Sequence, residues 1–129
     1  MKTCLVVDDS SVIRKVAKRI IEDLGHRFED AADGEEALLR CRDRLPDAII
    51  VDWQMPGMNG VEFIKAFKEK YADQSKNMPI MFCTSEMDVP AMTQAKRAGA
   101  SHFLMKPLDA KVVGQKLREA GLMSEPSFA

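Results

Sequence analysis

Four short apolar runs, each followed at once by a polar residue able to do chemistry, constrain this chain more than any other feature. They are TCLVV before Asp8, AIIV before Asp52, PIMFC before Thr84 and HFLM before Lys106. Runs of this length and continuous apolar character are typical of strands buried on both faces of a parallel sheet. The carboxyl ends of such strands lie side by side, so we expect the four polar positions to converge on one edge.

Amphipathic stretches separate the apolar runs and predict helices between the strands. Apolar residues recur at helical spacing from Val12 to Leu24, with Ser10 or Ser11 as the N-cap and Gly25 as the end. A weaker strand is predicted at 27–31. The remaining predicted elements are a helix over 34–45, strand 48–51, a helix after the loop 53–60, strand 79–83, helix 89–98, strand 102–105 and helix 109–120.

Five strand–helix units with short connections predict an α/β fold, in which a doubly wound five-stranded parallel sheet carries five helices on its two faces. Ligands of such sheets bind outside the carboxyl ends of the strands. We find no internal repeat, linker or second domain. Residues 1–123 are therefore expected to form one domain, and residues 124–129 a short frayed tail.

The charge balance and the termini exclude several classes of function. The formal net charge is −1, which argues against nucleic-acid or membrane-surface binding as the main role. No apolar run approaches the roughly 20 residues that span a bilayer. The apolar stretch before Asp8 is too short for a signal-peptide core, so we expect a cytoplasmic protein.

The cysteines and histidines carry no clear motif. Cys4, Cys41 and Cys83 are widely spaced, which favours reduced, mostly buried thiols over a disulfide or zinc framework. His26 and His102 flank predicted elements, and we expect both at the surface without a catalytic role.

The carboxylates at two strand ends can each be read in two ways. Asp52 can attack a phosphoryl group and form an acyl phosphate, although a lone aspartate at a strand end is more often a cap or turn residue. Asp8 and Asp9 can hold magnesium through their oxygens, or can simply form a solvated loop that caps the first helix.

The other two strand ends are equally ambiguous alone. Lys106 can neutralise phosphoryl oxygens or be an exposed lysine before a turn, and Pro107 raises the chance of a cis peptide bond. Thr84 can bond a phosphoryl oxygen or form a turn with Ser85. Phe103 is most simply a core aromatic. Taken together, the four strand ends predict a phosphorylation site with a magnesium ion.

The same residues lie in motifs that resemble the receiver domains of two-component response regulators, most closely the single-domain chemotaxis type. The motifs are VVDDSSVIRK at 6–15, VDWQMPGMNG at 51–60, CTSE at 83–86 and GASHFLMKP at 99–107. The resemblance extends over roughly residues 3–121. It implies the flavodoxin-like strand order 2-1-3-4-5, for which the chemotaxis receiver is itself a standard example.

The resemblance also implies a role for each site residue. Asp52 would accept a phosphoryl group from a sensor histidine kinase or a histidine phosphotransfer protein. Asp9 and Asp52 would bind Mg²⁺ directly, together with the backbone carbonyl of Gln54, and Asp8 would bind it mainly through water. The protein would catalyse only its own phosphorylation and dephosphorylation, and would not otherwise be an enzyme.

Further implied roles concern the switch. Lys106 would pair with the phosphoryl oxygens, Thr84 would bond one of them, and Phe103 would turn inward as Thr84 moves. Phe103 stands where tyrosine is common and so lacks a hydroxyl for a partner. Gln54 and Glu86 occupy positions that can tune the lifetime of the acyl phosphate.

No output domain follows the predicted receiver, so we expect a stand-alone monomer that acts by contact with an unidentified effector protein. The family usually signals through the face of helix 89–98, strand 102–105 and helix 109–120. Its basic residues either attract an acidic partner or form an ordinary solvated face; they are Lys96, Arg97, Lys111, Lys116 and Arg118. Met105 is expected to fill the core.

Three alternatives remain open. The chain can be a phosphate sink or relay intermediate without an effector, or a receiver cut from a larger regulator. It can also be a small-molecule phosphatase of the haloacid dehalogenase type, which uses a second aspartate two residues after the nucleophile. Gln54 stands at that position, which disfavours the phosphatase.

Overall fold

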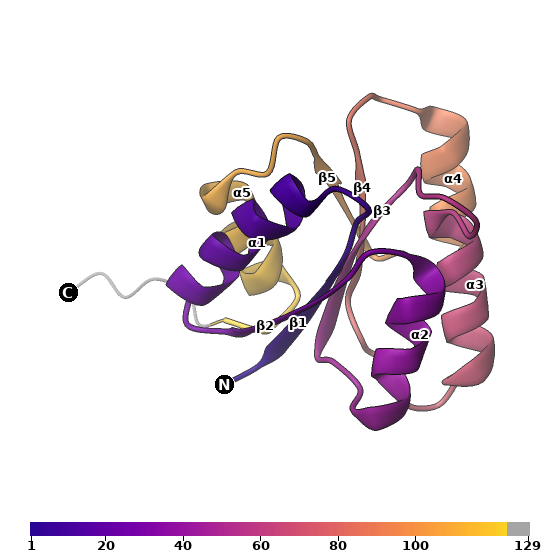
Figure 1. Cartoon of the computed structure of the whole chain (residues 1–129), viewed down its shortest axis with the longest axis horizontal. Helices are drawn as coiled ribbons and strands as arrows, with labels where there is room; N and C mark the ends of the chain where they lie inside the picture. The colour runs from indigo at the N-terminus through magenta and orange to yellow at the C-terminus, as the bar shows by residue number, and fades with distance from the viewer. Residues whose placement is uncertain (124–129) are drawn as a thin grey trace.

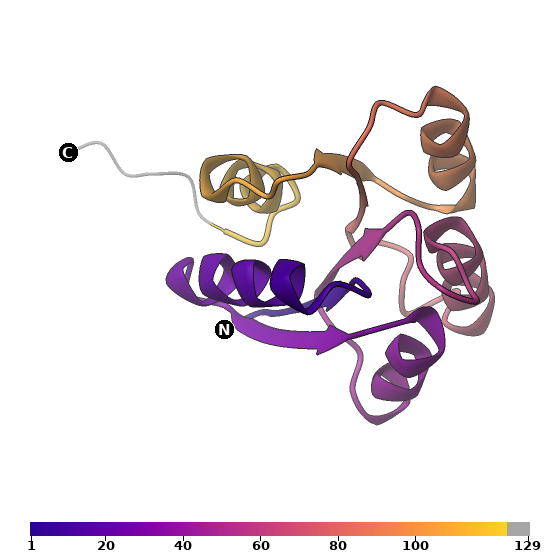
Figure 2. The ribbon, with the colours of Figure 1, turned by 45° about the horizontal axis from the view of Figure 1, so that its top comes forward.

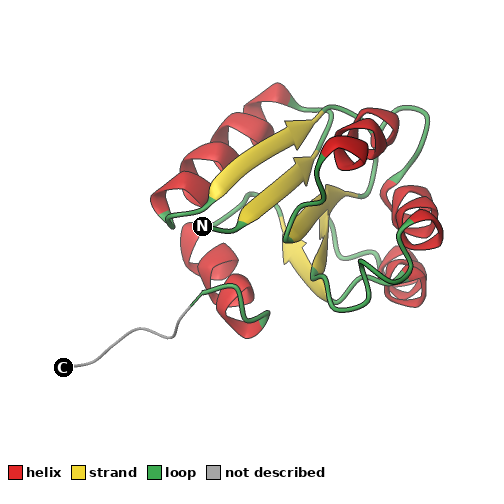
Figure 3. Ribbon diagram, turned by 90° about the horizontal axis from the view of Figure 1, so that it is seen from below, coloured by secondary structure: helices red, strands yellow, loops and turns green. Residues whose placement is uncertain are grey.

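Five parallel strands form one sheet in the order β2-β1-β3-β4-β5, which confirms the expected fold class and strand order (Figure 3). The protein is described from a computed structural model over residues 1–123, so the predicted tail lies outside the described residues. The strands are β1 (Thr3–Val7), β2 (Arg27–Ala31), β3 (Ala48–Asp52), β4 (Ile80–Thr84) and β5 (His102–Met105).

Helices cover both faces of this sheet (Figures 1 and 2). They are α1 (Ser11–Asp23), α2 (Gly34–Asp43), α3 (Gly60–Lys70), α4 (Val89–Ala98) and α5 (Ala110–Glu119). Helices α1 and α5 lie on one face, and α2, α3 and α4 on the other. None of the helices within residues 1–123 combines the length and the hydropathy needed to cross a bilayer.

The two helical layers explain why the central strands are continuously apolar. Alternate residues of β3 point to opposite faces, so that Ile49 and Val51 join one buried cluster with Phe63 and Phe67 of α3. Ile50 joins a second cluster on the face of α1 and α5. Every residue of β1, β3 and β4 is buried, as parallel strands between two layers must be.

Each of the five helices begins at a residue whose side chain accepts a hydrogen bond from the first turn. The caps are Ser10, Asp33, Asn59, Asp88 and Asp109. The first four backbone N–H groups of a helix have no partner within the helix. The cap side chains accept hydrogen bonds from some of these groups and so help to determine the residue at which each helix begins. Asn59 and Glu62 form a reciprocal capping box, so α3 begins at Gly60 and not after it as expected.

Several local expectations need correction. Strand β4 runs one residue later than predicted, which makes Thr84 its last residue. Met105 was wrongly assigned to the core; it is 44% exposed, at the end of the edge strand β5, which has a neighbouring strand on one side only. His26 and His102 are half-buried rather than on the open surface, and both ring nitrogens of His26 are shielded from solvent.

The three cysteines are all buried and unpaired, as predicted. Burial raises the pKa of Cys4 and Cys83 to about 12 and that of Cys41 to about 11. At neutral pH these thiols are therefore protonated and pack as small apolar groups.

Candidate functional site

The strand register brings the predicted residues to one edge of the sheet. The backbone N–H of Asp8 donates to Ala31 O at the end of β2, and Asp52 ends β3 opposite Cys83. Thr84 ends β4 opposite Met105, and the N–H of Lys106 donates to the carbonyl of Thr84. The four strand ends are thus level with one another, as the parallel arrangement requires.

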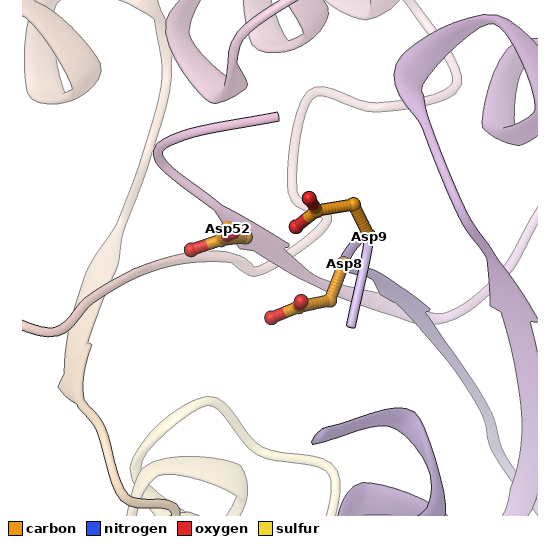
Figure 4. A group of neighbouring side chains, drawn as sticks. All are labelled: Asp8, Asp9 and Asp52. Atoms are coloured by element: carbon orange, nitrogen blue, oxygen red, sulfur yellow. The ribbon is translucent and has the colours of Figure 1, made fainter. Parts of the chain in front are cut away.

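Three carboxylates gather at this edge, from the ends of β1 and β3 (Figure 4). One oxygen from each of Asp8, Asp9 and Asp52 lies within 4.8 Å of the others. Asp8 and Asp52 are buried, whereas Asp9 is exposed. Hard divalent cations bind carboxylate oxygens, and magnesium keeps several waters, so this set with one open side fits such an ion.

The ammonium group of Lys106 lies between the two buried carboxylates. Its Nζ is 2.8 Å from Asp8 Oδ2 and 3.0 Å from Asp52 Oδ1. Only 16% of the lysine side chain is exposed, so water screens these contacts poorly. The peptide bond from Lys106 to Pro107 is cis, in line with the expectation from the sequence.

Burial and the neighbouring charges both shift the pKa values in this cluster. Burial raises the pKa of Asp52, the hydrogen bond from Lys106 lowers it, and the charge of Asp8 raises it again, leaving it above its ordinary value. Burial alone would lower the pKa of Lys106, but its bonds to Asp8 and Asp52 outweigh burial and raise it. Three carboxylates facing one ammonium leave the excess negative charge that a divalent cation would neutralise.

The hydroxyl of Thr84 stabilises the turn after β4, which is one of the two roles that the sequence left open. Its hydroxyl donates to the carbonyl of Glu86 at 2.9 Å and accepts from the N–H of Glu86 at 3.3 Å. Thr84 still lines a cavity of about 230 Å³ beside Asp52, together with Lys106 and Gln54. A phosphoryl oxygen entering this cavity would have to compete with Glu86 for the hydroxyl.

The switch position and its neighbours form a row of aromatic rings. Phe103 is half-buried, and its ring meets Phe82 edge-on with 6.3 Å between centroids. The ring centroid of Trp53, the residue after Asp52, lies 5.7 Å from that of Phe82. Phe103 is thus in part a core aromatic, the simplest interpretation of the sequence.

Two residues that no sequence motif singled out as site residues help to hold the site together. Arg14 of α1 donates from Nη1 to the backbone carbonyl of Asp8 at 2.8 Å. Gly60 lets the start of α3 approach the backbone of Asp52 so closely that a Cβ there would lie 2.3 Å from the Asp52 carbonyl oxygen. Helical spacing does not reveal either contact, because both partners belong to other elements.

Known proteins are similar to this chain over most of its length. Residues 4–118 match the family described as the response regulator receiver domain. The chain is 31% identical to chemotaxis protein CheY of Pseudomonas aeruginosa, over 89% of this chain and 92% of that protein. It is 32% identical to chemotaxis protein CheY-3 of Vibrio cholerae, over 88% of this chain and 86% of that protein.

Solved structures agree with the sequence comparison. The Vibrio cholerae chemotaxis protein CheY4, crystallised at low pH, has a TM-score of 0.87 and 36% identity, covering 93% of this chain and 98% of that one. A response regulator described as putative, from Chloroflexus aurantiacus, has a TM-score of 0.85 and 29% identity, covering 92% and 96%. This chain therefore belongs to the response regulator receiver family, as a CheY-like signalling domain of two-component systems.

Proposed function

We propose that the chain works as a CheY-like response regulator in which Asp52 accepts a phosphoryl group in a magnesium-dependent reaction. The donor is a phosphohistidine of a sensor histidine kinase or a histidine phosphotransfer protein. The observation that carries the proposal is the meeting of Asp8, Asp9, Asp52 and Lys106 at one sheet edge. No other described part of the chain combines clustered carboxylates with a buried ammonium group.

The residues present suit this transfer. An oxygen of Asp52 forms a bond to phosphorus while the phosphorus–nitrogen bond of the donor breaks, and the imidazole leaves with the electron pair. Asp9 and Asp52, with the carbonyl of Gln54, would hold the ion directly, and Asp8 would hold it mainly through water. Bound there, magnesium would supply positive charge to the phosphoryl oxygens. Lys106 would exchange its contact with Asp52 for a phosphoryl oxygen, as its flexible stem allows.

Incubation with magnesium and acetyl phosphate is expected to add one phosphoryl group to the native chain and none to Asp52→Asn. Intact-mass spectrometry measures the adduct, and chelation of magnesium should abolish it. Asp73→Asn is the matched control, since it makes the same change at an exposed loop position. Equal labelling of Asp52→Asn and the native chain, or labelling that persists without magnesium, would contradict the proposal.

Phosphorylation would act on the β4–α4 loop through Thr84. If the hydroxyl turns to a phosphoryl oxygen, both of its bonds with Glu86 are lost and the loop is released. The loop carries Met87, which is 69% exposed, and leads into α4, whose first residue Val89 is 62% exposed. Phe103 lies on the neighbouring strand. We infer that these side chains form part of the surface that an effector reads.

The face of α4, β5 and α5 is mixed in character rather than uniformly basic. Lys116 lies 3.6 Å from Glu119 on the same helix, and Arg97 lines a hollow between α3 and α4 with Lys65. Exposed Met105 and Val112 lie on β5 and α5. An effector for this face would therefore combine apolar contacts with some acidic ones.

Amide hydrogen exchange gives the test of the switch. We expect exchange over residues 84–89 to change severalfold in the phosphorylated chain, with a smaller change over 102–105, because the Thr84–Glu86 bonds are broken. Asp52→Asn treated identically is the control and should show no change. Unaltered exchange in a chain that mass spectrometry shows to be phosphorylated would rule out this switch and leave a phosphate sink as the better interpretation.

A further inference from the structure

The guanidinium group of Arg14 binds two segments outside its own helix: the backbone that follows β1, and strand β2. Nη1 donates to the carbonyl oxygen of Asp8 at 2.8 Å, and Nε donates to Asp30 Oδ2 on β2 at 3.0 Å. The Arg14 side chain is only 20% exposed. A planar group with one donor bonded to a backbone carbonyl and another to a carboxylate is held more firmly than an ordinary solvated arginine on a helix.

The peptide that Arg14 contacts is the one that joins the two acidic residues. The N–H of Asp8 is bound to Ala31, and its carbonyl to Arg14, so the backbone is held on both sides. The carboxylate of Asp8 is held separately, by Lys106 and by the N–H of Ser10. The direction of Asp9 therefore depends on this braced backbone.

Asp9 has no comparable support of its own. Its side chain is exposed, and within residues 1–123 it makes no recorded hydrogen bond or ion pair. Even so, one of its oxygens lies with those of Asp8 and Asp52 within 4.8 Å. Since nothing binds the carboxylate directly, the backbone fixes the direction of the Asp9 Cα–Cβ bond, and that direction decides which rotamers can face Asp8 and Asp52.

We propose that Arg14, held in place by Asp30, is a positioning residue of the divalent-cation site, acting through the Asp8 carbonyl on the carboxylate of Asp9. The inference rests on the proposed function, since it concerns the same magnesium site. Arg14 does not touch the ion. It restricts the backbone so that less order has to be gained when the ion binds.

The sign of the effect separates positioning from simple electrostatics. Arg14 is a cation near a cation site, so its charge alone repels magnesium, and removing that charge would tighten binding. A positioning role predicts the reverse, because Asp9 would then sample directions that do not face the ion. Loss of a group that orients metal ligands typically weakens binding by about 10-fold to 100-fold.

The experiment is a magnesium titration of the full chain by isothermal titration calorimetry at constant ionic strength, without any phosphoryl donor. Emission of Trp53, the single tryptophan, gives a second readout because its side chain lines the cavity beside Asp52. Arg14→Met is expected to raise the magnesium dissociation constant about tenfold. Lys18→Met removes the same charge from an exposed position one turn further along α1. This control should change the magnesium dissociation constant by less than about twofold.

Two further variants sharpen the outcome. Arg14→Lys keeps the charge but loses the planar pair of donors, so magnesium binding should again weaken. If Arg14→Met does not fold, Arg14→Lys tests the positioning role by itself. Asp30→Asn added to Arg14→Met should weaken binding little further, since Asp30 acts through Arg14. Unchanged or tighter binding by both Arg14 variants overturns the inference, whereas a native chain that binds no magnesium overturns the proposed function itself.

Discussion

Replacing Lys106 with methionine is expected to lower the free energy of unfolding by about 3 kcal/mol at neutral pH without magnesium. Lys106 contacts both buried carboxylates, at 2.8 Å from Asp8 and 3.0 Å from Asp52. Methionine keeps most of the stem and its packing, so the change removes chiefly the charge. Two carboxylates are then left in a buried place without their cation, which is the costly way to break an ion pair.

The loss should depend on pH in a definite direction. The pKa of Asp52 is already raised, by burial and by Asp8, and it should rise further when Lys106 is removed. A carboxyl whose folded pKa exceeds its unfolded value contributes stability at low pH that is lost as pH rises through the folded pKa. The deficit of Lys106→Met should therefore shrink as the pH is lowered from neutral, as urea unfolding at several pH values can measure.

Controls can separate this from a general effect of losing a lysine. Adding Asp52→Asn to Lys106→Met should recover part of the stability, because one of the two uncompensated carboxylates is then neutral while Asp8 remains charged. Lys111→Met, at an exposed position on α5, should change the unfolding free energy by less than about 0.5 kcal/mol. Equal losses at positions 106 and 111, or a loss that does not vary with pH, would contradict the assignment of Lys106 to the acidic cluster.

Gly60→Ala is expected to destabilise the fold by about 3 kcal/mol and to slow phosphorylation as well. An added Cβ would lie 2.3 Å from the carbonyl oxygen of Asp52 and 3.2 Å from Cε1 of Phe82. The first neighbour is backbone at the end of a buried strand, so it cannot rotate away. Either α3 or the end of β3 must shift, and the second choice displaces Asp52.

Gly114 of α5 offers a matched comparison within the same protein. A Cβ there meets only flexible side-chain ends, the nearest being Arg118 Nη1 at 3.4 Å. Alanine is a better helix former than glycine by about 1 kcal/mol, so Gly114→Ala should be neutral or stabilising. Chemical denaturation and the rate of labelling by acetyl phosphate measure both effects. A loss below about 0.5 kcal/mol for Gly60→Ala would show that the start of α3 adapts easily.

Much of the architecture was open to prediction because it depends on local and periodic properties. The apolar runs are short, bounded and continuous, and burial between two helical layers accounts for that pattern. The parallel arrangement then requires Asp8, Asp52, Thr84 and Lys106 to meet at one edge, whatever the details of packing. The strand order came from the family resemblance, not from periodicity.

The errors and omissions share one physical cause. Met105 and His26 differ from expectation because exposure depends on whether a distant element covers the residue. The hydrogen bonds between Thr84 and Glu86 depend on the backbone path of the turn after β4. A threonine at this position can bind either the turn or a phosphoryl oxygen, so residue type alone does not decide between them. Neither apolar period nor residue type contains this information.

The sequence by itself determined the elements and which residues stand at the strand ends, since these follow from spacing along one chain. The family followed from the resemblance of its motifs to known receiver domains. Only the tertiary structure decided how those residues are held: Lys106 between two carboxylates, Arg14 on the Asp8 carbonyl, and Gly60 against the backbone of Asp52. Each is a contact of a few ångströms between different elements. Such contacts depend on how the helices are placed over the sheet, and that placement results from the packing of the whole core.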